Sequence, residues 1–211
     1  MGLNMTMNTV ARRCGLALLA LLSICSILAC DGGPRSRSLV FHSVDITGAN
    51  YARDFSMTDM HGKVRYLNEF TGRVVMVFFG YTQCPDVCPT TLAEISALRQ
   101  ALGDAGKNVQ PIFITLDPVR DTSEILRAYL ANFGDDVIGL RGSVEQTQQA
   151  AKAFKVYFKQ VQGKTPDTYN LDHTAGTYVF DTQGQLRLFT RYGMPPQQLQ
   201  QDVSALLAEA N

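Results

Sequence analysis

The most strongly patterned stretch of the chain is Val74–Phe79, in which every residue is apolar. A run of this length that is apolar on both faces predicts a strand buried in a sheet that helices cover. Val109–Leu116 predicts a second buried strand. Between the two runs, apolar residues recur on one side of a predicted helix that begins near Thr90; they are Leu92, Ile95, Ala97 and Leu98.

The remaining patterned segments predict further helices and hairpins. Ser143–Phe154 predicts a helix capped by Ser143, with Gln146 three residues later completing a capping box. Thr177–Asp181 and Leu186–Thr190 flank a polar turn and predict a hairpin. Further predicted elements are a hairpin within Phe55–Phe70, a helix over Ser123–Phe133 and a last helix from about Pro196 to Glu209. This order predicts an α/β fold with a mixed central sheet, helices on both faces and an extra N-terminal hairpin.

The first thirty residues carry a targeting pattern. Arg12 and Arg13 precede the uncharged apolar stretch Cys14–Ala29, which is typical of an export signal and short for a membrane-spanning helix. The stretch leads into Cys30, and Ile27-Leu28-Ala29-Cys30 resembles the bacterial lipoprotein cleavage box, whose cysteine is lipidated. A lipid anchor at Cys30 and an uncleaved N-terminal helix both stay open. Both place the rest of the chain at the periplasmic face of the inner membrane.

The predicted domain organisation follows from this segment. Residues 1–29 are a signal peptide or membrane anchor, residues 30–50 are a flexible tether, and residues 51–211 form one domain. The 211 residues include 19 basic and 19 acidic side chains, so the formal net charge is zero and nothing indicates a nucleic-acid partner. After cleavage before Cys30, Cys84 and Cys88 would be the only free thiols, in an oxidising compartment.

The candidate chemistry lies at Cys84 and Cys88. Their loop joins a predicted buried strand to the N-terminus of a helix, where backbone N–H groups and the helix dipole stabilise thiolates. A strand, two cysteines and a helix also form the thioredoxin arrangement, but thioredoxins have two residues between the thiols and this chain has three. The wider spacing is compatible with a disulfide or with a metal ion held by both sulfurs. Taken as an isolated pair, the cysteines favour a redox couple.

A histidine would change this interpretation. Two thiolates are too few for a structural zinc site, whereas soft thiolates favour Cu(I), and one imidazole would complete a site for either oxidation state of copper. His42 lies in the predicted tether, His61 lies in a predicted turn, and His173 lies in a loop before the strand Thr177–Asp181. In a thioredoxin-like sheet that loop returns beside the cysteine loop. From the residues alone, His173 fits a ligand and an ordinary loop side chain equally well.

Three separated motifs resemble those of the Sco/SenC family. They are Phe79–Leu92, Leu116–Thr122, and Asp172-His173 followed by Tyr178–Asp181. The resemblance runs from about Asp45 to the C-terminus. It implies a thioredoxin-like fold and a membrane-tethered copper metallochaperone, not an enzyme, that helps assemble the dinuclear copper site of cytochrome c oxidase. It assigns the copper ligands to Cys84, Cys88 and His173. The implied partners are the oxidase subunit that carries this site, other copper chaperones and thioredoxin-like reductants.

Two other functions stay open. The protein could be a thiol-disulfide oxidoreductase that reduces the cysteines of the oxidase's copper site, or a redox or copper sensor. A redox disulfide between Cys84 and Cys88 would serve both. His173 discriminates, because disulfide exchange needs no third ligand. The strand at Thr177 also lacks the preceding proline that thioredoxins have, which disfavours a generic disulfide oxidoreductase.

Several other side chains near the motifs have predicted roles. Asp172 is expected to orient the His173 ring by a hydrogen bond, as metal-binding histidines need. Asp117 is expected to dock a partner or to tune the site, and Asp86 is expected to point to solvent and face a partner. Asp121 is predicted to be a turn residue. Three methionines are expected to pack rather than to act as soft ligands: Met57, Met60 and Met194.

Overall fold

The computed structural model describes residues 40–209 except 164, 166 and 167. The elements in chain order are β1 (Val44–Asp45), β2 (Ser56–Asp59), β3 (Val64–Tyr66), η1 (Leu67–Phe70), β4 (Val74–Gly80), α2 (Val87–Ala101), η2 (Gly103–Asn108), β5 (Val109–Thr115), α3 (Ser123–Leu130), β6 (Ile138–Arg141), α4 (Val144–Ala153), β7 (Phe158–Gln162), β8 (Tyr169–His173), β9 (Gly176–Phe180), β10 (Leu186–Arg191) and α5 (Pro196–Ala208). The expected signal or anchor and Cys30 lie outside the described residues. Among the described helices, none has the length and apolar character needed to cross a membrane.

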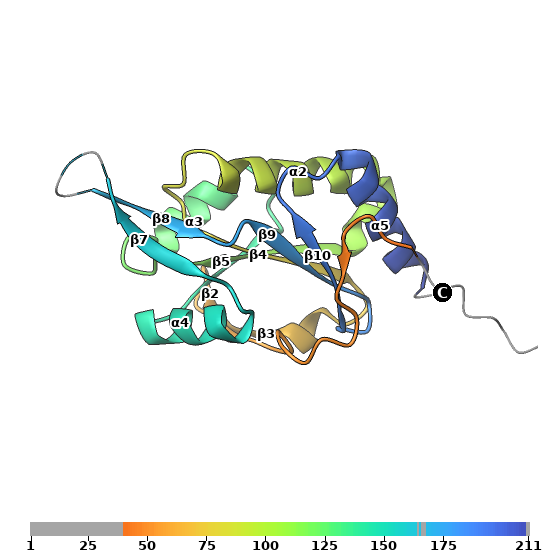
Figure 1. The fold of residues 1–211 in the computed structure, drawn as a ribbon, viewed down its shortest axis with the longest axis horizontal. Coiled ribbons are helices and arrows are strands. Elements are labelled where there is room, and N and C mark those ends of the chain that lie inside the picture. Colours follow the sequence, from red (N-terminus) through yellow and green to blue (C-terminus); the bar gives the residue numbers. More distant parts are fainter. Residues whose placement is uncertain (1–39, 164, 166–167, 210–211) are drawn as a thin grey trace, which may run out of the picture. The chain divides into compact units, whose positions relative to one another are not determined.

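Eight strands form one mixed sheet in the order β1-β10-β9-β4-β5-β6-β2-β3. Strands β4, β5 and β6 are parallel to one another, and the other neighbouring pairs are antiparallel. Strand β4 lies in the middle and all of its residues are buried, which confirms the strand expected at Val74–Phe79. Strands β7 and β8 form a separate two-stranded ribbon, which projects from one end of the sheet in Figure 1.

Helices cover both faces of the sheet (Figure 1). Helices α2 and α5 pack on one face through an apolar cluster made of Val74, Met76, Ile95, Leu98, Val109, Val179, Leu188, Leu199, Val203 and Leu206. Helix α4 lies against the other face, where the ring of Phe154 is 5.1 Å from that of Phe79. The predicted α/β fold, with a mixed sheet and helices on both faces, is therefore confirmed.

Two local signals in the sequence are also confirmed. Ser143 caps α4 by accepting a hydrogen bond from the backbone N–H of Gln146 at 3.2 Å, and the Gln146 side chain accepts one from the Ser143 backbone at 2.8 Å. The N-terminal hairpin pairs β2 with β3. In its turn, the Asp59 carboxylate accepts hydrogen bonds from the backbone of His61 and Lys63, at 2.9 and 3.0 Å.

The expected end of the tether at residue 50 is wrong, because the chain is already part of the fold before that point. Strand β1 pairs with β10, with Val44 opposite Phe189. Just before it, the backbone N–H groups of His42 and Ser43 donate to the Asp202 carboxylate at 2.8 and 2.7 Å. This segment is rich in small and polar residues, so its sequence gave no sign that it pairs with β10, far along the chain.

Besides β1, three strands were not expected from the sequence. Strand β6 is short and contains a glycine, and the ribbon strands β7 and β8 are mostly exposed and polar. Strand β7 lacks the apolar alternation that marks a half-buried strand, and in β8 the alternation covers only the four residues Tyr169–Asp172. The consequence matters for the site, because His173 is the last residue of β8 and not a loop residue.

Candidate metal centre

The structure brings Cys84, Cys88 and His173 together. One potential ligand atom from each lies within 4.8 Å of the others, and Cys88 Sγ is 3.5 Å from His173 Nε2. Both thiols are free; Cys84 is half-buried and Cys88 is fully buried. Two soft sulfurs and one imidazole nitrogen at this spacing form a donor set that suits a thiophilic metal ion.

The cysteines owe their positions to the junction between β4 and α2. Helix α2 begins at Val87, earlier than expected, so Cys88 lies in its first turn while Cys84 lies in the loop before it. Gly80 ends β4 directly beneath the buried thiol. A Cβ atom built on Gly80 would lie only 2.7 Å from Cys88 Sγ. The absence of a side chain at Gly80 therefore makes room for the sulfur.

Backbone and aromatic contacts hold the His173 ring. Its Nδ1 is 3.0 Å from the carbonyl oxygen of Thr174. Because a carbonyl only accepts, Nδ1 carries the proton and the lone pair of Nε2 is directed at the thiols. The rings of Phe78 and Tyr81 each lie edge-on to the imidazole, with centroids 6.1 Å away. This tautomer is the one needed for a metal ligand at Nε2.

Asp172 does not orient this ring, contrary to expectation. Its side chain is exposed, and the hydrogen-bond partner of His173 Nδ1 is the carbonyl of Thr174. The two residues are neighbours in strand β8, where successive side chains point to opposite sides. The sequence-based assignment failed because it placed both residues in a loop.

The two thiols differ in acidity. The pKa of Cys84 is lowered to about 3, first by a hydrogen bond from the Cys88 thiol and then, against the effect of burial, by the backbone N–H groups of Asp86 and Cys88. The pKa of Cys88 is raised, because its proton is shared with Cys84 and because it is buried. Of the two thiols, Cys84 is therefore the more acidic and Cys88 the less acidic.

Asp117 lies beside the site but is not available for docking. Its side chain is 4% exposed, pairs with Arg120 and accepts a hydrogen bond from the Tyr169 hydroxyl at 2.9 Å. A carboxylate enclosed in this way cannot contact a partner directly, so the expected docking role of Asp117 is wrong. Asp86, in contrast, is exposed in the loop between the cysteines, as expected.

Asp121 has a larger role than a turn residue. It is fully buried, and its carboxylate accepts hydrogen bonds from the Thr82 backbone at 3.1 Å, the Thr82 hydroxyl at 2.6 Å and the Thr115 hydroxyl at 2.5 Å. Burial raises its pKa against these hydrogen bonds. Because Thr82 lies two residues before Cys84, Asp121 fixes the start of the cysteine loop. The only trace of this role in the sequence is its place in the motif Leu116–Thr122.

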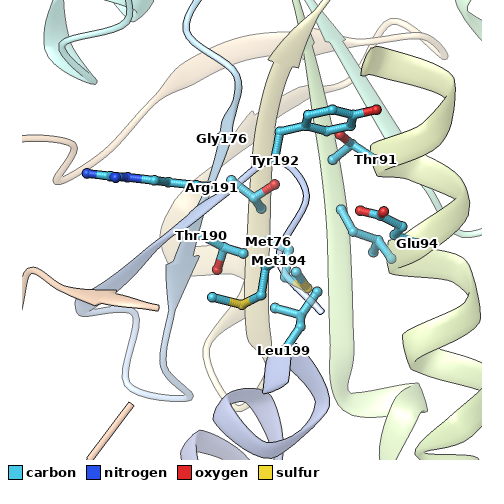
Figure 2. A pocket seen from close by; sticks show the side chains of 11 residues that line it. Met76, Thr91, Glu94, Gly176, Thr190, Arg191, Tyr192, Met194 and Leu199 are labelled. Atoms are coloured by element: carbon cyan, nitrogen blue, oxygen red, sulfur yellow. The ribbon is translucent and has the colours of Figure 1, made fainter. Parts of the chain in front are cut away.

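The methionines are packing residues in the described part of the chain. Met57 and Met60 are buried in the core. Met194 lines a small cavity between α2, α5 and the ends of β9 and β10 (Figure 2). This cavity holds about 20 Å³, and Thr91 and Glu94 of α2 also line it. None of the three candidate ligands lines it, so the cavity is separate from the candidate metal centre.

Comparisons with known proteins agree with the geometry. The SCO1/SenC family model matches residues 43–208. A SCO2-like protein of Rickettsia felis is 37% identical over 133 residues, which cover 63% of this chain and 65% of that protein. The mitochondrial SCO2 homolog of Bos taurus is 38% identical over 141 residues, which cover 66% of this chain and 52% of that protein. The match thus spans between half and two thirds of these relatives.

A solved structure is similar over a larger share of its own length. Bradyrhizobium japonicum ScoI, determined with copper bound, superposes with a TM-score of 0.64 at 35% identity, and the match covers 72% of this chain and 95% of that one. The expected thioredoxin-like fold is thereby confirmed. Because the family model covers most of the sequence, including all three residues of the candidate centre, the chain belongs to the SCO1/SenC family.

Proposed function

We propose that this protein is a copper metallochaperone that binds one copper ion through Cys84, Cys88 and His173 and delivers it to the dinuclear copper site of cytochrome c oxidase. The observation that carries the proposal is the convergence of two free thiols and one imidazole within 4.8 Å. Copper is the cargo of this site and not a resident catalyst. The family resemblance supplies the recipient, the oxidase subunit that carries the dinuclear site.

The donor set favours copper over other common ions. Two thiolates hold Cu(I), and the imidazole adds the third ligand that Cu(II) requires. A structural zinc ion would need a fourth protein ligand, and the described part of the chain groups only these three residues at the site. The half-buried position of Cys84 leaves the site accessible for transfer of the ion to a partner.

The N-terminal sequence supports a membrane tether. Arg12 and Arg13 before an apolar stretch hold the N-terminus in the cytoplasm and direct the rest of the chain outward. A lipid at Cys30, or the apolar stretch itself, anchors the chain at the periplasmic face of the inner membrane. Tethering raises the effective concentration of donor and acceptor at one bilayer, so a weak docking contact suffices for transfer.

Replacing His173 tests the proposed function. His173→Ala is expected to weaken Cu(II) binding by about 100-fold or more, because a ligand contributes at least as much as the groups that orient it. Cu(I) binding should change far less, since two thiolates alone hold the softer ion. Competitive titration of the reduced full-length protein with each ion measures both affinities.

His61→Ala is the matched control, because His61 is exposed in the β2–β3 turn. It should leave both affinities unchanged. In cells at limiting copper, His173→Ala should lower oxidase activity, and added copper should restore it. Cu(II) affinity of His173→Ala equal to that of the wild type would remove His173 from the site. Normal filling of the dinuclear site in cells that lack this protein would refute the delivery role.

A thiol-disulfide oxidoreductase is the second candidate function. The observation in its favour is the unequal acidity of two thiols that lie within 4.8 Å, with Cys84 the more exposed. A Cys84 thiolate can attack a disulfide of the partner, and Cys88 can then displace the partner's sulfur and leave a Cys84–Cys88 disulfide. Two electrons pass to the partner in this exchange.

Alkylation of the reduced protein tests the unusual acidity of Cys84. Because the thiolate is the nucleophile and the pKa of Cys84 lies near 3, its rate of reaction with iodoacetamide should stay constant from pH 8 down to pH 5. An ordinary thiol slows about tenfold per pH unit over this range. Mass-spectrometric peptide mapping identifies the modified residue. Cys88→Ala should make the rate fall more steeply with falling pH than in the wild type, since the Cys88 thiol is the largest cause of the lowered pKa. A tenfold fall per unit in the wild type would contradict this assignment.

A further inference from the structure

Arg120 lies between the loop that carries the cysteines and the ribbon that carries His173. Its side chain is 18% exposed. One guanidinium nitrogen donates to Gln83 Oε1 at 3.0 Å and to the carbonyl oxygen of Tyr169 at 2.8 Å, and another pairs with Asp117. The guanidinium carbon is also 3.5 Å from the centroid of the Tyr169 ring. A single side chain therefore binds two segments that lie far apart in the sequence.

These two segments are the ones that carry the candidate ligands. Gln83 directly precedes Cys84. Tyr169 and His173 are the first and last residues of strand β8. The Tyr169 hydroxyl donates to Asp117 Oδ1 at 2.9 Å and so closes a ring of contacts around the guanidinium. Arg120 thus ties β8 to the cysteine loop, in addition to the burial of Leu171 of β8 in the core.

The ribbon needs such an attachment. Strands β7 and β8 pair with each other and not with the main sheet. A two-stranded ribbon by itself is only marginally stable in water, so its place against the fold depends on side-chain contacts. The Nε2 of His173 lies 3.5 Å from Cys88 Sγ only while the ribbon is held there.

We propose that Arg120 is a positioning residue that holds the His173 strand against the cysteine pair and thereby sets the affinity for Cu(II). This inference rests on the proposed function, because it concerns the same three ligands. Two properties of arginine could carry the effect: its charge and its planar fork of N–H donors. The contacts favour the fork, since the guanidinium reaches Gln83, Tyr169 and Asp117 in different directions while stacking on a ring.

Arg120→Lys separates the two properties, because lysine keeps the charge and lacks the fork. We expect R120K to lower the Cu(II) affinity of the reduced full-length protein by about 10- to 100-fold, the range found for groups that orient metal ligands. Cu(I) affinity should stay within about twofold, because the thiolates are untouched. The absorption spectrum of the Cu(II) complex should shift toward that of His173→Ala, since R120K weakens the imidazole's contact with the ion and His173→Ala removes it.

Arg141→Lys is the matched control. Arg141 donates to the carbonyl oxygens of Asp121 and Pro118 at 3.0 and 2.8 Å, so it supports the same Leu116–Thr122 loop without touching the ribbon. R141K should leave the Cu(II) affinity and spectrum unchanged even where it lowers the melting temperature. A loss of Cu(II) affinity in R141K equal to that in R120K would assign the effect to loop disorder and overturn the proposal.

A double-mutant cycle decides whether Arg120 acts through His173. In the His173→Ala background, R120K should have no further effect on Cu(II) affinity, because the ligand that it positions is gone. An undiminished effect there, or wild-type Cu(II) affinity in R120K, overturns the proposal. If R120K does not fold, Tyr169→Phe replaces it, since this change removes only the hydroxyl bond to Asp117; a several-fold loss of Cu(II) affinity is expected, and no loss overturns the proposal.

Failure of the positioning role of Arg120 can be distinguished from failure of the proposed metal centre. Failure of wild-type protein to bind Cu(II), or the same affinity in His173→Ala, refutes the metal centre itself. Strong dependence on His173 together with wild-type affinity in R120K keeps the metal centre and refutes only the positioning role of Arg120.

Discussion

Alanine at Cys84 or at Cys88 is expected to abolish tight binding of copper in both oxidation states. Each substitution removes a thiolate, and the remaining sulfur and imidazole cannot match the preference of Cu(I) for two soft ligands. We expect affinity to fall by at least about 100-fold for either ion, more than the loss of a group that only orients a ligand. Titration of the reduced protein against a competing chelator measures this, with thermal unfolding as the check on the fold.

Met194→Leu is the matched control for the cysteine variants. It removes a soft sulfur of similar size that lines the cavity in Figure 2, away from the candidate centre. Copper affinity should be unchanged, because none of the three candidate ligands contacts that cavity. Copper affinity within tenfold of wild type in both cysteine variants, or a large loss in Met194→Leu, would contradict the assignment of the ligands.

The predicted variants differ in which oxidation state they affect. Loss of either cysteine should affect Cu(I) and Cu(II) alike, whereas His173→Ala and Arg120→Lys should affect mainly Cu(II). The difference arises because two thiolates satisfy Cu(I), while Cu(II) also needs the imidazole. Measurement of both ions on the same set of variants therefore distinguishes the ligands from the residue that positions one of them.

The sequence alone was sufficient for the central part of the fold. The uninterrupted apolar run at Val74–Phe79 predicted a strand buried on both faces, and it forms strand β4 in the middle of the sheet. The capping box at Ser143 and the turn around His61 are local signals that need no tertiary information. Elements of this kind are predictable because their causes lie within a few residues of one another.

The elements that were missed depend on distant partners. Strand β1 forms because Val44 meets Phe189, and the polar strands of the ribbon form because they meet each other. Strand β7 has no apolar alternation, and the alternation in β8 is too short to mark a strand by itself. The role expected for Asp172 was wrong for the same reason. Strand β8 was not predicted, and strand geometry turns the side chain of Asp172 away from that of His173.

The site was predictable only in part for a similar reason. Cys84 and Cys88 are close in sequence, but His173 lies 85 positions after Cys88. The residues alone left His173 ambiguous, and the family resemblance selected it. The supporting residues Arg120 and Asp121 belong to a recognisable motif, yet their targets in the cysteine loop and the ribbon become visible only in the folded chain.

The second large effect is expected at Gly80, which has no side chain of its own to contribute. A Cβ atom at this position would lie 2.7 Å from Cys88 Sγ and 2.9 Å from the rings of Phe78 and Phe113, all closer than normal contacts. Gly80→Ala should therefore displace the Cys88 sulfur and destabilise the fold by about 1–3 kcal/mol, the usual cost of overpacking a core. Because both ions need Cys88, we expect Cu(I) and Cu(II) affinity each to fall by about tenfold or more.

Gly139→Ala separates displacement of the sulfur from general destabilisation. A Cβ atom on Gly139 would meet Leu130 Cδ1 at 2.5 Å and no residue of the candidate centre, so the core is overpacked at a different place. This variant should unfold at a lower denaturant concentration than the wild type, as Gly80→Ala does, and should bind both copper ions with wild-type affinity. Equal copper affinity in the two variants would show that the space beneath the buried thiol does not control binding. A loss confined to Gly80→Ala would show that the bare backbone at the end of β4 shapes the metal centre as directly as the ligands do.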